Sequence, residues 1–448
     1  YGYVYTNGGY KVNNNTPVSY GSTYTTGDII GVTLDADSGS LTFYKNNTSQ
    51  GVAYTGLTNG PYVPALADTS GAVGTTFNIN FGQRPFSYTP PSGYVALNTY
   101  NLSTPTIIQG NRYMDATLWT GTGTTLNVVN AAQFKPDFVW VKARSSAYSN
   151  ALYDSVRGTG TTKSLLSNDT ASEGTYSIYT NLTSFNSNGF TAGSTSSTNI
   201  LNENAVTFVG WQWQAGQGST SSNTSGSITS TVSVNTTAGF SVVTYTGTGA
   251  NATVGHGLGV APSMFIIKSR SGATDWVVYH SAIGATKALF LNKTSAQDTS
   301  ISYFNNTAPT STLFSIGYGA DVNPNTANLV AYCFAEIAGF SKFGSYTGNG
   351  STDGPFVFTN FLSKWIMIKA SSSAGYNWYV WDSNRNTYNV LGEELSPNLS
   401  DAAATQTDLD ITSNGFKLRT SASRANGSGI TYIYACFATN PFKNSNAF

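Results

Sequence analysis

The chain has 448 residues, of which 13% are aromatic and 40% hydrophobic, while only 9% carry a charge. A disordered chain needs few aromatic residues and a high net charge, so this composition speaks against disorder. The 21 basic and 21 acidic residues cancel and no run of Lys or Arg occurs, which argues against binding of nucleic acid through a basic surface.

The composition favours an all-β fold. Strand-forming and turn-forming residues are plentiful, including 28 Tyr, 24 Phe and 46 Gly, whereas helix-forming residues are scarce. The length corresponds to about two to four domains. No run of roughly 18 or more apolar residues occurs, so we expect no membrane insertion.

Residues 1–95 are predicted to form a unit of their own. Apolar and polar residues alternate over Gly27–Asp35, a turn follows at Asp37–Gly39, and a second strand returns over Leu41–Lys45. This pattern predicts a β-hairpin. Further apolar segments follow, at Pro61–Ala65 and Phe77–Gly82.

Over residues 27–82 this order of motifs resembles the second half of a SPRY domain, a concanavalin-like β-sandwich. A sandwich without its first strands would expose an apolar sheet face and open edges, so we expect the sequence to be part of a longer polypeptide. SPRY domains are protein-interaction modules. Their binding loops come partly from the half that is absent here, so the resemblance assigns no binding residue.

A linker is predicted at 96–111, marked by Pro105. Three repeats are predicted after it, at residues 112–216, 239–339 and 340–448. A stretch rich in Gly, Ser and Thr at 217–238 separates the first two repeats, and its loose alternation from Ile228 to Val234 predicts an edge strand.

Four sequence marks recur in each repeat in the same order. An aromatic-Thr-Gly-x-Gly turn comes first, at Trp119–Gly123, Tyr245–Gly249 and Tyr346–Gly350. An apolar run ending in lysine follows, at Phe138–Lys142, Met264–Lys268 and Trp365–Lys369. An aromatic residue, then Asp or His, then Ser comes next, at Tyr153–Ser155, Tyr279–Ser281 and Trp381–Ser383. An apolar run closes each repeat, at Val209–Trp213, Val330–Phe334 and Ile433–Phe437. Units of about 100 residues can each hold a core.

We expect each repeat to be a two-layer β-sandwich of the jelly-roll or concanavalin-like type. Each contains roughly seven short strands divided by Asn, Gly and Ser turns. The strands place polar residues toward one side and aromatic or β-branched residues toward the other, which is typical of sheets with one buried face. Cys333 and Cys436 share one column of consecutive repeats. We expect them to be buried free thiols, because separate sandwiches would hold them beyond the roughly 7 Å that a disulfide allows.

Several segments together resemble fibre-type virion proteins of marine tailed phages: residues 80–86, the Pro-Pro-Ser-Gly-Tyr segment at 90–94, residues 97–102 and the run 134–142. The resemblance covers nearly the whole chain. It implies a location on the virion surface, with other virion proteins as partners. Because of how fibres are built, it also implies a homo-oligomer, expected to be a trimer. The shared motifs are structural, so they imply a location more than an activity.

The sequence reveals no catalytic, cofactor-binding or metal-binding constellation. His256 lies between glycines and is expected at a turn or on the surface, while His280 replaces the Asp of the other repeats, which argues against a shared catalytic role. No Cys/His cluster has metal-ligand spacing. The serines of that motif, Ser155, Ser281 and Ser383, lack the Gly-x-Ser-x-Gly turn of a nucleophile.

The acidic residues also point to structural roles. Asp35 and Asp37 imitate the start of a calcium loop, but no glutamate completes it and the hairpin turn is preferred. Glu393, Glu394 and Asp382 are candidate carboxylates for glycoside hydrolysis, although an exposed loop is the preferred interpretation. Lysines and acids of neighbouring strands are expected to form repeated ion pairs, involving Lys142, Lys268, Lys369, Asp154 and Asp382.

The sequence therefore predicts a non-enzymatic virion structural protein, a fibre or surface appendage that presents host-contacting sandwiches and needs no cofactor. Aromatic residues beside Asn, Ser and Thr could bind a neutral host glycan, but the binding residues stay unknown at this point. One alternative is a glycan-degrading depolymerase fibre, which needs carboxylates converging in a groove. The other is a secreted bacterial adhesin or filament component.

Overall fold

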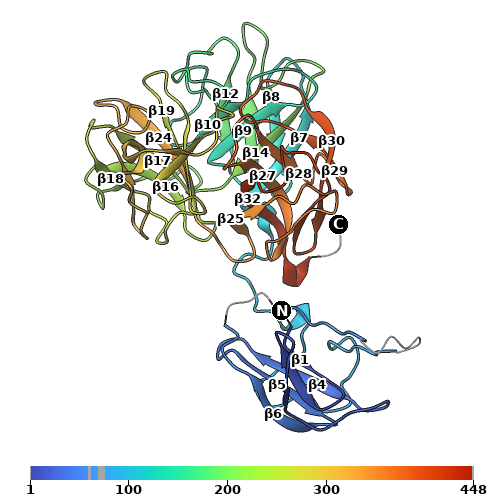
Figure 1. Ribbon diagram of the computed structural model, residues 1–448. Coiled ribbons are helices and arrows are strands. Elements are labelled where there is room, and N and C mark those ends of the chain that lie inside the picture. Colours follow the sequence, from blue (N-terminus) through green and yellow to red (C-terminus); the bar gives the residue numbers. More distant parts are fainter. Residues whose placement is uncertain (1, 59–61, 69–75, 446–448) are drawn as a thin grey trace. The chain divides into compact units, whose positions relative to one another are not determined.

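The computed structural model describes residues 2–58, 62–68 and 76–445, and it confirms the all-β prediction (Figure 1). The chain divides into two compact units, residues 1–103 and 104–448. Among the described residues, no helix combines the length and the apolar character needed to cross a bilayer.

The described residues of the N-terminal unit form two three-stranded antiparallel sheets. One consists of β1 (Val4–Tyr5), β2 (Tyr10–Asn13) and β3 (Thr16–Ser19), and the other of β4 (Ile30–Asp35), β5 (Ser40–Lys45) and β6 (Thr48–Tyr54). The strands β4 and β5 form the predicted hairpin, in which Asp35 pairs with Ser40. Tyr5, Leu41 and Phe43 lie in a small core between the sheets.

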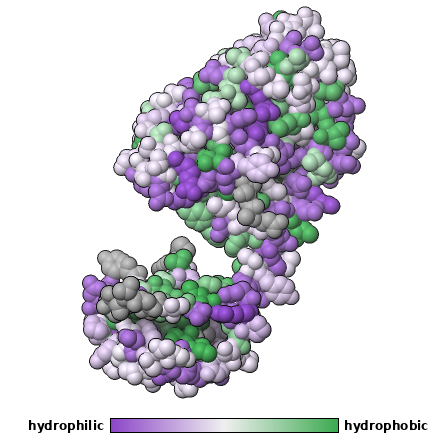
Figure 2. Space-filling view, turned by 90° about the vertical axis from the view of Figure 1, so that its right-hand side faces the viewer, coloured by the Kyte–Doolittle hydropathy of each residue, from purple (hydrophilic) through white to green (hydrophobic). Residues whose placement is uncertain are grey.

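The second of these sheets keeps part of its apolar face open. Val32 and Leu34 on the edge strand β4 pair directly with the buried Phe43 and Leu41, so they point to the same face, yet they are 60% and 38% exposed. Apolar surface is visible on this unit in Figure 2. The predicted segment Phe77–Gly82 forms no strand, and Pro61 of the other segment lies outside the described residues.

Residues 104–448 contain three sandwiches of eight strands each in the part of the chain that the structure describes. The first consists of β7 (Met114–Thr120), β8 (Leu126–Val129), β9 (Phe138–Ala143), β10 (Ala151–Asp154), β11 (Leu165–Leu166), β12 (Leu182–Asn186), β13 (Gly189–Ala192) and β14 (Thr207–Trp213). The second consists of β17 (Phe240–Thr246), β18 (Ala252–Gly255), β19 (Met264–Ser269), β20 (Val277–His280), β21 (Lys287–Phe290), β22 (Asp298–Thr299), β23 (Leu313–Ile316) and β24 (Asn328–Phe334), with one helical turn, α1 (Ile301–Phe304). The third consists of β25 (Ser341–Thr347), β26 (Phe356–Phe358), β27 (Phe361–Ala370), β28 (Trp378–Asp382), β29 (Leu391–Glu394), β30 (Ala404–Thr412), β31 (Gly415–Leu418) and β32 (Thr431–Pro441).

Between the first and second sandwiches the chain adds two strands, β15 (Ser221–Asn223) and β16 (Ser230–Asn235), to the sheet of the second. The expected edge strand thus exists as β16, but β15 covers its outer side and forms the edge itself. Short 3₁₀ turns occur at Thr99–Asn101, Gly110–Arg112 and Phe442–Asn444.

The three sandwiches share one topology. The main sheet of each contains the same four strands in the same order, namely β7-β14-β9-β10, β17-β24-β19-β20 and β25-β32-β27-β28. The closing strand therefore lies inside the sheet, between the first strand and the lysine-ended strand. The smaller sheets correspond too, because β8, β18 and β26 pair with β13, β23 and β31.

Several strands of the main sheets are buried on both faces, which corrects the prediction of one buried face per sheet. Every residue of β9, β10, β19, β20 and β28 is buried. One face packs on the smaller sheet of the same sandwich. The other face enters a hydrophobic cluster to which all three sandwiches contribute. Figure 1 shows the three sandwiches packed side by side in this body.

An aromatic triangle lies at the centre of the shared core. Trp213, Phe334 and Phe437 occupy the same column at the ends of the three closing runs. Their ring centroids are 6.1 Å apart for Trp213 and Phe334, 5.7 Å for Trp213 and Phe437, and 5.8 Å for Phe334 and Phe437. These nearly equal sides place a pseudo-threefold axis through the triangle, so one chain builds a trimer-like body.

Candidate functional site

Asp154, His280 and Asp382 occupy equivalent positions in the three repeats and are called the Asp/His column. They lie at the interfaces between successive sandwiches. Asp154 of the first sandwich accepts a hydrogen bond of 2.8 Å from the Tyr332 hydroxyl of the second. Asp382 of the third accepts one of 3.0 Å from the Trp211 indole of the first. His280 of the second lies with Nε2 3.1 Å from the Tyr434 carbonyl of the third. Each sandwich thus contacts the closing strand of the next one, and the third contacts the first.

The hydrogen-bond partner in the next sandwich explains why the second repeat has histidine in this column. Trp211 and Tyr332 carry N–H or O–H donors, but Ala435 occupies their column in the third sandwich. The residue facing it must therefore donate to a backbone carbonyl, which a neutral imidazole can do and a carboxylate cannot. Nδ1 of His280 accepts the backbone N–H of Ala282 at 3.2 Å. Burial lowers the pKa of His280 to about 4, so the ring is neutral at pH 7.

The two aspartates are each held by an arginine three residues later, Arg157 and Arg385. Burial alone would raise the pKa of Asp382, but the Arg385 charge and the hydrogen bonds from Trp211 and Arg385 lower it below its usual value. In the second sandwich Ile283 stands in the arginine column, which matches the neutral His280. The column is structural in all three sandwiches.

The expected ion pairs between the lysine and aspartate columns are wrong. In the antiparallel pair β9–β10, Phe138 lies opposite Asp154, so Lys142 and Asp154 are at opposite ends, about 13 Å apart at the usual rise per residue. Lys142 instead donates to the carbonyls of Ala143, Tyr148 and Ser400 at 3.0, 2.8 and 3.0 Å.

The other two lysines bind in the same way. Lys268 donates to the Thr170 carbonyl at 3.0 Å, and Lys369 to the Thr294 carbonyl at 3.2 Å. In each case the acceptor belongs to the preceding sandwich of the ring. For Lys142 of the first sandwich the acceptor is Ser400 of the third, so the third sandwich precedes the first in the ring. Burial lowers the pKa of Lys142 to about 7 and of Lys268 and Lys369 to about 8. The lysine and Asp/His columns together close the three sandwiches into a ring.

The remaining sequence candidates are also bound within the fold. His256 occupies the expected glycine turn but is buried rather than on the surface, with Nε2 3.1 Å from the Thr310 carbonyl. Asp35 accepts the backbone N–H groups of Asp37 and Ser38 in the predicted hairpin turn. The hydroxyl of Ser155 donates to Asp137 at 2.7 Å. Cys333 and Cys436 are buried free thiols, as predicted.

The three candidate carboxylates do not come together. Glu393 pairs with Arg144 of the first sandwich at 2.8 Å, and Asp382 is held at its own interface. Glu394 lies beside Asp408 and Arg424. Burial and then the Asp408 charge raise the pKa of Glu394 to about 7. Sequence reasoning missed Asp408 because the pair forms across two strands whose register has a bulge.

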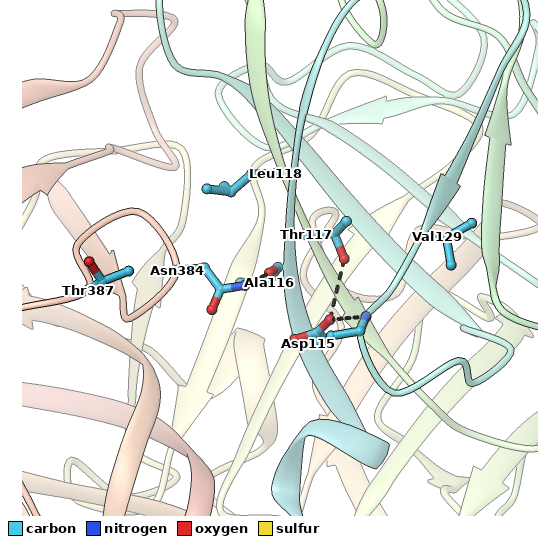
Figure 3. A pocket seen from close by; sticks show the side chains of 8 residues that line it. Asp115, Ala116, Thr117, Leu118, Val129, Asn384 and Thr387 are labelled. Atoms are coloured by element: carbon cyan, nitrogen blue, oxygen red, sulfur yellow. Dashed lines mark hydrogen bonds between the residues drawn. The ribbon is translucent and has the colours of Figure 1, made fainter. Parts of the chain in front are cut away.

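A shallow pocket opens where the third sandwich meets the first (Figure 3). It has a volume of about 310 Å³ and is lined by Asp115, Ala116, Thr117, Leu118, Val129, Ala131, Asn384 and Thr387. Strands β7 and β8 form one side, and the loop after β28 forms the other. The amide of Asn384 donates to the Ala116 carbonyl and fixes the loop to β7.

The charges of this pocket are compensated. Asp115 is fully buried and lies 3.2 Å from the Lys364 ammonium, which also donates to Asn384 at 2.7 Å. The Asp115 carboxylate further accepts the backbone N–H of Ala131 at 2.9 Å. The site therefore carries no net charge.

The loop Asn384–Val390 is braced by its own polar side chains. Asn386 accepts the backbone N–H of Glu393 at 2.8 Å, and Asn389 bonds both backbone groups of Ile411, at 2.7 and 2.8 Å. Between these anchors Thr387 and Tyr388 face solvent, and Tyr388 is 80% exposed. No other aromatic side chain in the described part of the three-sandwich body is exposed as much.

This interface differs from its two counterparts. In the other two repeats, Ser241 and Lys342 stand at the position of Asp115, and Asp137 and Ser263 stand at the position of Lys364. Neither of the other two interfaces therefore repeats the ion pair of Asp115 and Lys364. The column of Asn384 holds Val156 and Ala282. This pocket thus belongs to one interface of the ring. Sequence reasoning missed it because it joins residues about 270 positions apart.

Among the described residues, no group of three or more His, Cys, Asp or Glu side chains is placed to hold a metal ion.

Comparisons with known proteins agree with the two units. The SPRY domain family matches residues 1–84. The E3 ubiquitin-protein ligase RKP of Arabidopsis thaliana is 37% identical over 82 residues, which are 17% of this chain and 6% of the ligase. Ran-binding protein 10 of Danio rerio and Ran-binding protein 9 of Mus musculus are each 35% identical over 88 residues, which are 20% of this chain and 14% and 13% of those proteins. The chain therefore spans only a small part of these relatives.

The three-sandwich body has a match of its own. The family described as Domain of unknown function (DUF7483) matches residues 109–441, from the last linker residues to the end of β32. Because this match covers well over half of the sequence, the protein belongs to the DUF7483 family.

Proposed function

We propose that the protein is a non-enzymatic structural component of a phage virion, a fibre or surface appendage that presents the three-sandwich ring to the host. The observation that carries the proposal is the use of the recurring polar columns. Lys142, Lys268 and Lys369, together with Asp154, His280 and Asp382, all hold the ring closed. Repetition here serves architecture, as expected of a virion protein.

Immunogold labelling of purified particles with antibody to residues 104–448 tests this role. We expect gold on the particle surface and peptides of this chain in the particle's mass spectrum. Particles without label and without these peptides would remove the proposal. Unlabelled particles together with gold label on bacterial cells would support the alternative of a secreted adhesin or filament component.

Homotrimerisation of the whole chain stays a prediction. The ring already uses, within one chain, the faces through which a trimer of single sandwiches would form. Other surfaces would therefore have to join three chains. Mass photometry of the purified protein at several concentrations separates a monomer from a trimer.

A depolymerase is the second candidate function, and the pair Glu394 and Asp408 is the observation that favours it. One carboxyl with a pKa raised to about 7 beside a second carboxylate is an arrangement that glycoside hydrolases use. Against it, both residues are buried and neither lines the pocket described above. Reducing sugar released from host polysaccharide, and its loss in Glu394→Gln, would establish the enzyme.

A further inference from the structure

We infer that the pocket between the third and first sandwiches, together with the braced loop Asn384–Val390, binds a neutral saccharide. This inference rests on the proposed host-contacting role and names the class of ligand that such a surface would take.

The loop Asn384–Val390 carries an exposed aromatic side chain. Seven of the eight tryptophans are buried in cores, so they offer no stacking surface. Tyr388 is 80% exposed, although a large aromatic side chain gains free energy by burial. Tyr388 follows the lining residue Thr387 on the same loop, although it does not itself line the pocket. An exposed tyrosine ring on the loop that borders the pocket can stack on the apolar face of a pyranose while its hydroxyl stays in water.

The lining of the pocket combines polar groups with apolar side chains. Figure 3 shows hydroxyl and amide groups of Thr117, Thr387 and Asn384 around the pocket, with the apolar side chains of Leu118 and Val129 beside them. Sugars present the same combination of hydroxyl groups and apolar C–H faces. The only carboxylate, Asp115, is paired with Lys364. A charged sugar would therefore find no partner of opposite charge.

The backbone of the loop is preorganised by its asparagines. Asn384, Asn386 and Asn389 tie the loop to β7, β29 and β30, so Thr387 and Tyr388 are held in place before a ligand arrives. A braced loop loses little conformational entropy on binding. The volume of about 310 Å³ is at the lower end of ligand pockets, which span roughly 300–1,000 Å³. One terminal sugar ring of a glycan is thus the expected occupant.

The test uses the full chain and titrates it with D-galactose, D-glucose, D-mannose and their N-acetylated 2-amino forms, with glucuronic acid as the charged comparison. Binding is measured by ligand-observed NMR and on an array of neutral and acidic glycans. We expect at least one neutral sugar to bind and glucuronic acid to bind at least about tenfold more weakly, since nothing in the site compensates its charge.

Variants locate the site. Tyr388→Ala is expected to weaken binding about tenfold, the upper end of what one aromatic contact contributes. Tyr318→Ala is the matched control, because Tyr318 is a 56% exposed tyrosine of the second sandwich. Both side chains are exposed, so both variants should fold, and far-UV circular dichroism verifies this.

Two results would overturn the inference: no neutral sugar binds the wild-type chain, or Tyr388→Ala binds as tightly as Tyr318→Ala. These results are independent of particle labelling. Labelled virions without sugar binding would leave the structural role intact, whereas sugar binding by a chain absent from virions would support the adhesin alternative and keep the site.

Discussion

His280 is neutral because its partner in the next sandwich is a carbonyl, and this has a consequence for pH dependence. The pKa of about 4 in the folded chain lies below the usual value of 6.5. The unfolded chain therefore binds more protons between pH 6.5 and 4. Stability from this residue is complete above pH 6.5 and is lost as the pH falls toward 4, by about 3 kcal/mol in total.

Urea unfolding at pH 7.0, 5.5 and 4.0 measures this loss. Carboxylates also titrate in this range, so the comparison is made with His280→Gln, whose amide can donate to the same Tyr434 carbonyl without titrating. We expect the wild type to lose more stability than the variant over this range. Parallel pH profiles of the two proteins would contradict the buried neutral imidazole.

A second prediction concerns the exchange of Asp and His in this column. His280→Asp places a carboxylate opposite a carbonyl in a fully buried position, without an arginine nearby, since residue 283 is isoleucine. An uncompensated buried charge costs about 3–5 kcal/mol. The double variant His280→Asp with Ile283→Arg rebuilds the pair seen at Asp154–Arg157 and should recover part of that loss. Equal stability of the single and double variants would contradict this.

At the level of elements, each Thr-Gly-x-Gly turn is held by a buried asparagine. In the second sandwich Asn323 accepts the Thr248 N–H at 2.7 Å and donates to the Ala250 carbonyl. Gly247 is required, because a Cβ there would lie 2.1 Å from the Pro324 carbonyl oxygen. Asn202 and Asn426 bind the other two turns in the same way. All three asparagines stand seven residues before the closing run, a spacing that the sequence contains.

Replacing Asn323 tests how much its hydrogen bonds to the turn contribute to stability. Asn323→Ala removes two hydrogen bonds made by a fully buried side chain, each worth about 0.5–1.5 kcal/mol. We expect a loss of about 1–3 kcal/mol in the free energy of unfolding, measured by urea denaturation. Asn325→Ala, two residues further on and exposed, should change stability by less than about 0.5 kcal/mol. Similar losses of stability in both variants would contradict a specific role of the Asn323 hydrogen bonds, because any change in this loop would then lower the free energy of unfolding.

Some elements could be predicted from the sequence and others could not. The hairpin of Gly27–Lys45 and the repeated turns follow from alternation and from glycines with positive φ, which are local properties. The double burial of β9 and β19 was missed, although the uninterrupted runs Phe138–Val141 and Met264–Ile267 are typical of strands buried on both faces. The Lys–Asp pairs were wrong because the strand register, which decides which residues face each other, depends on the length of the connecting turn.

At the level of the whole body, the closed ring could not be read from the repeats. Tandem sandwiches can also form an extended string, and the period of the sequence is the same in both arrangements. The difference lies in whether Trp213, Phe334 and Phe437 face solvent or one another, and these contacts join residues more than 100 positions apart. The candidate site also depends on contacts between distant parts of the chain. It exists only where the ring closes, so neither Asp115 nor Tyr388 is marked by any local pattern.

The ring makes a final prediction about cooperativity. Because the central cluster takes side chains from all three sandwiches, none of them can unfold without exposing the core of the other two. We expect residues 104–448 to unfold in one transition, with tryptophan fluorescence and far-UV circular dichroism giving the same midpoint. Phe334→Ala and Phe437→Ala lie in different sandwiches, yet each should shift this one transition by about 3–5 kcal/mol.

The exposed Phe358→Ala provides the control, with an expected change below about 0.5 kcal/mol, because its side chain is 53% exposed on β26. If the sandwiches were independent, Phe437→Ala would split off a separate early transition and leave the rest of the curve in place. A single shifted curve for both triangle variants therefore distinguishes one shared core from three separate ones, and with it a ring from a string.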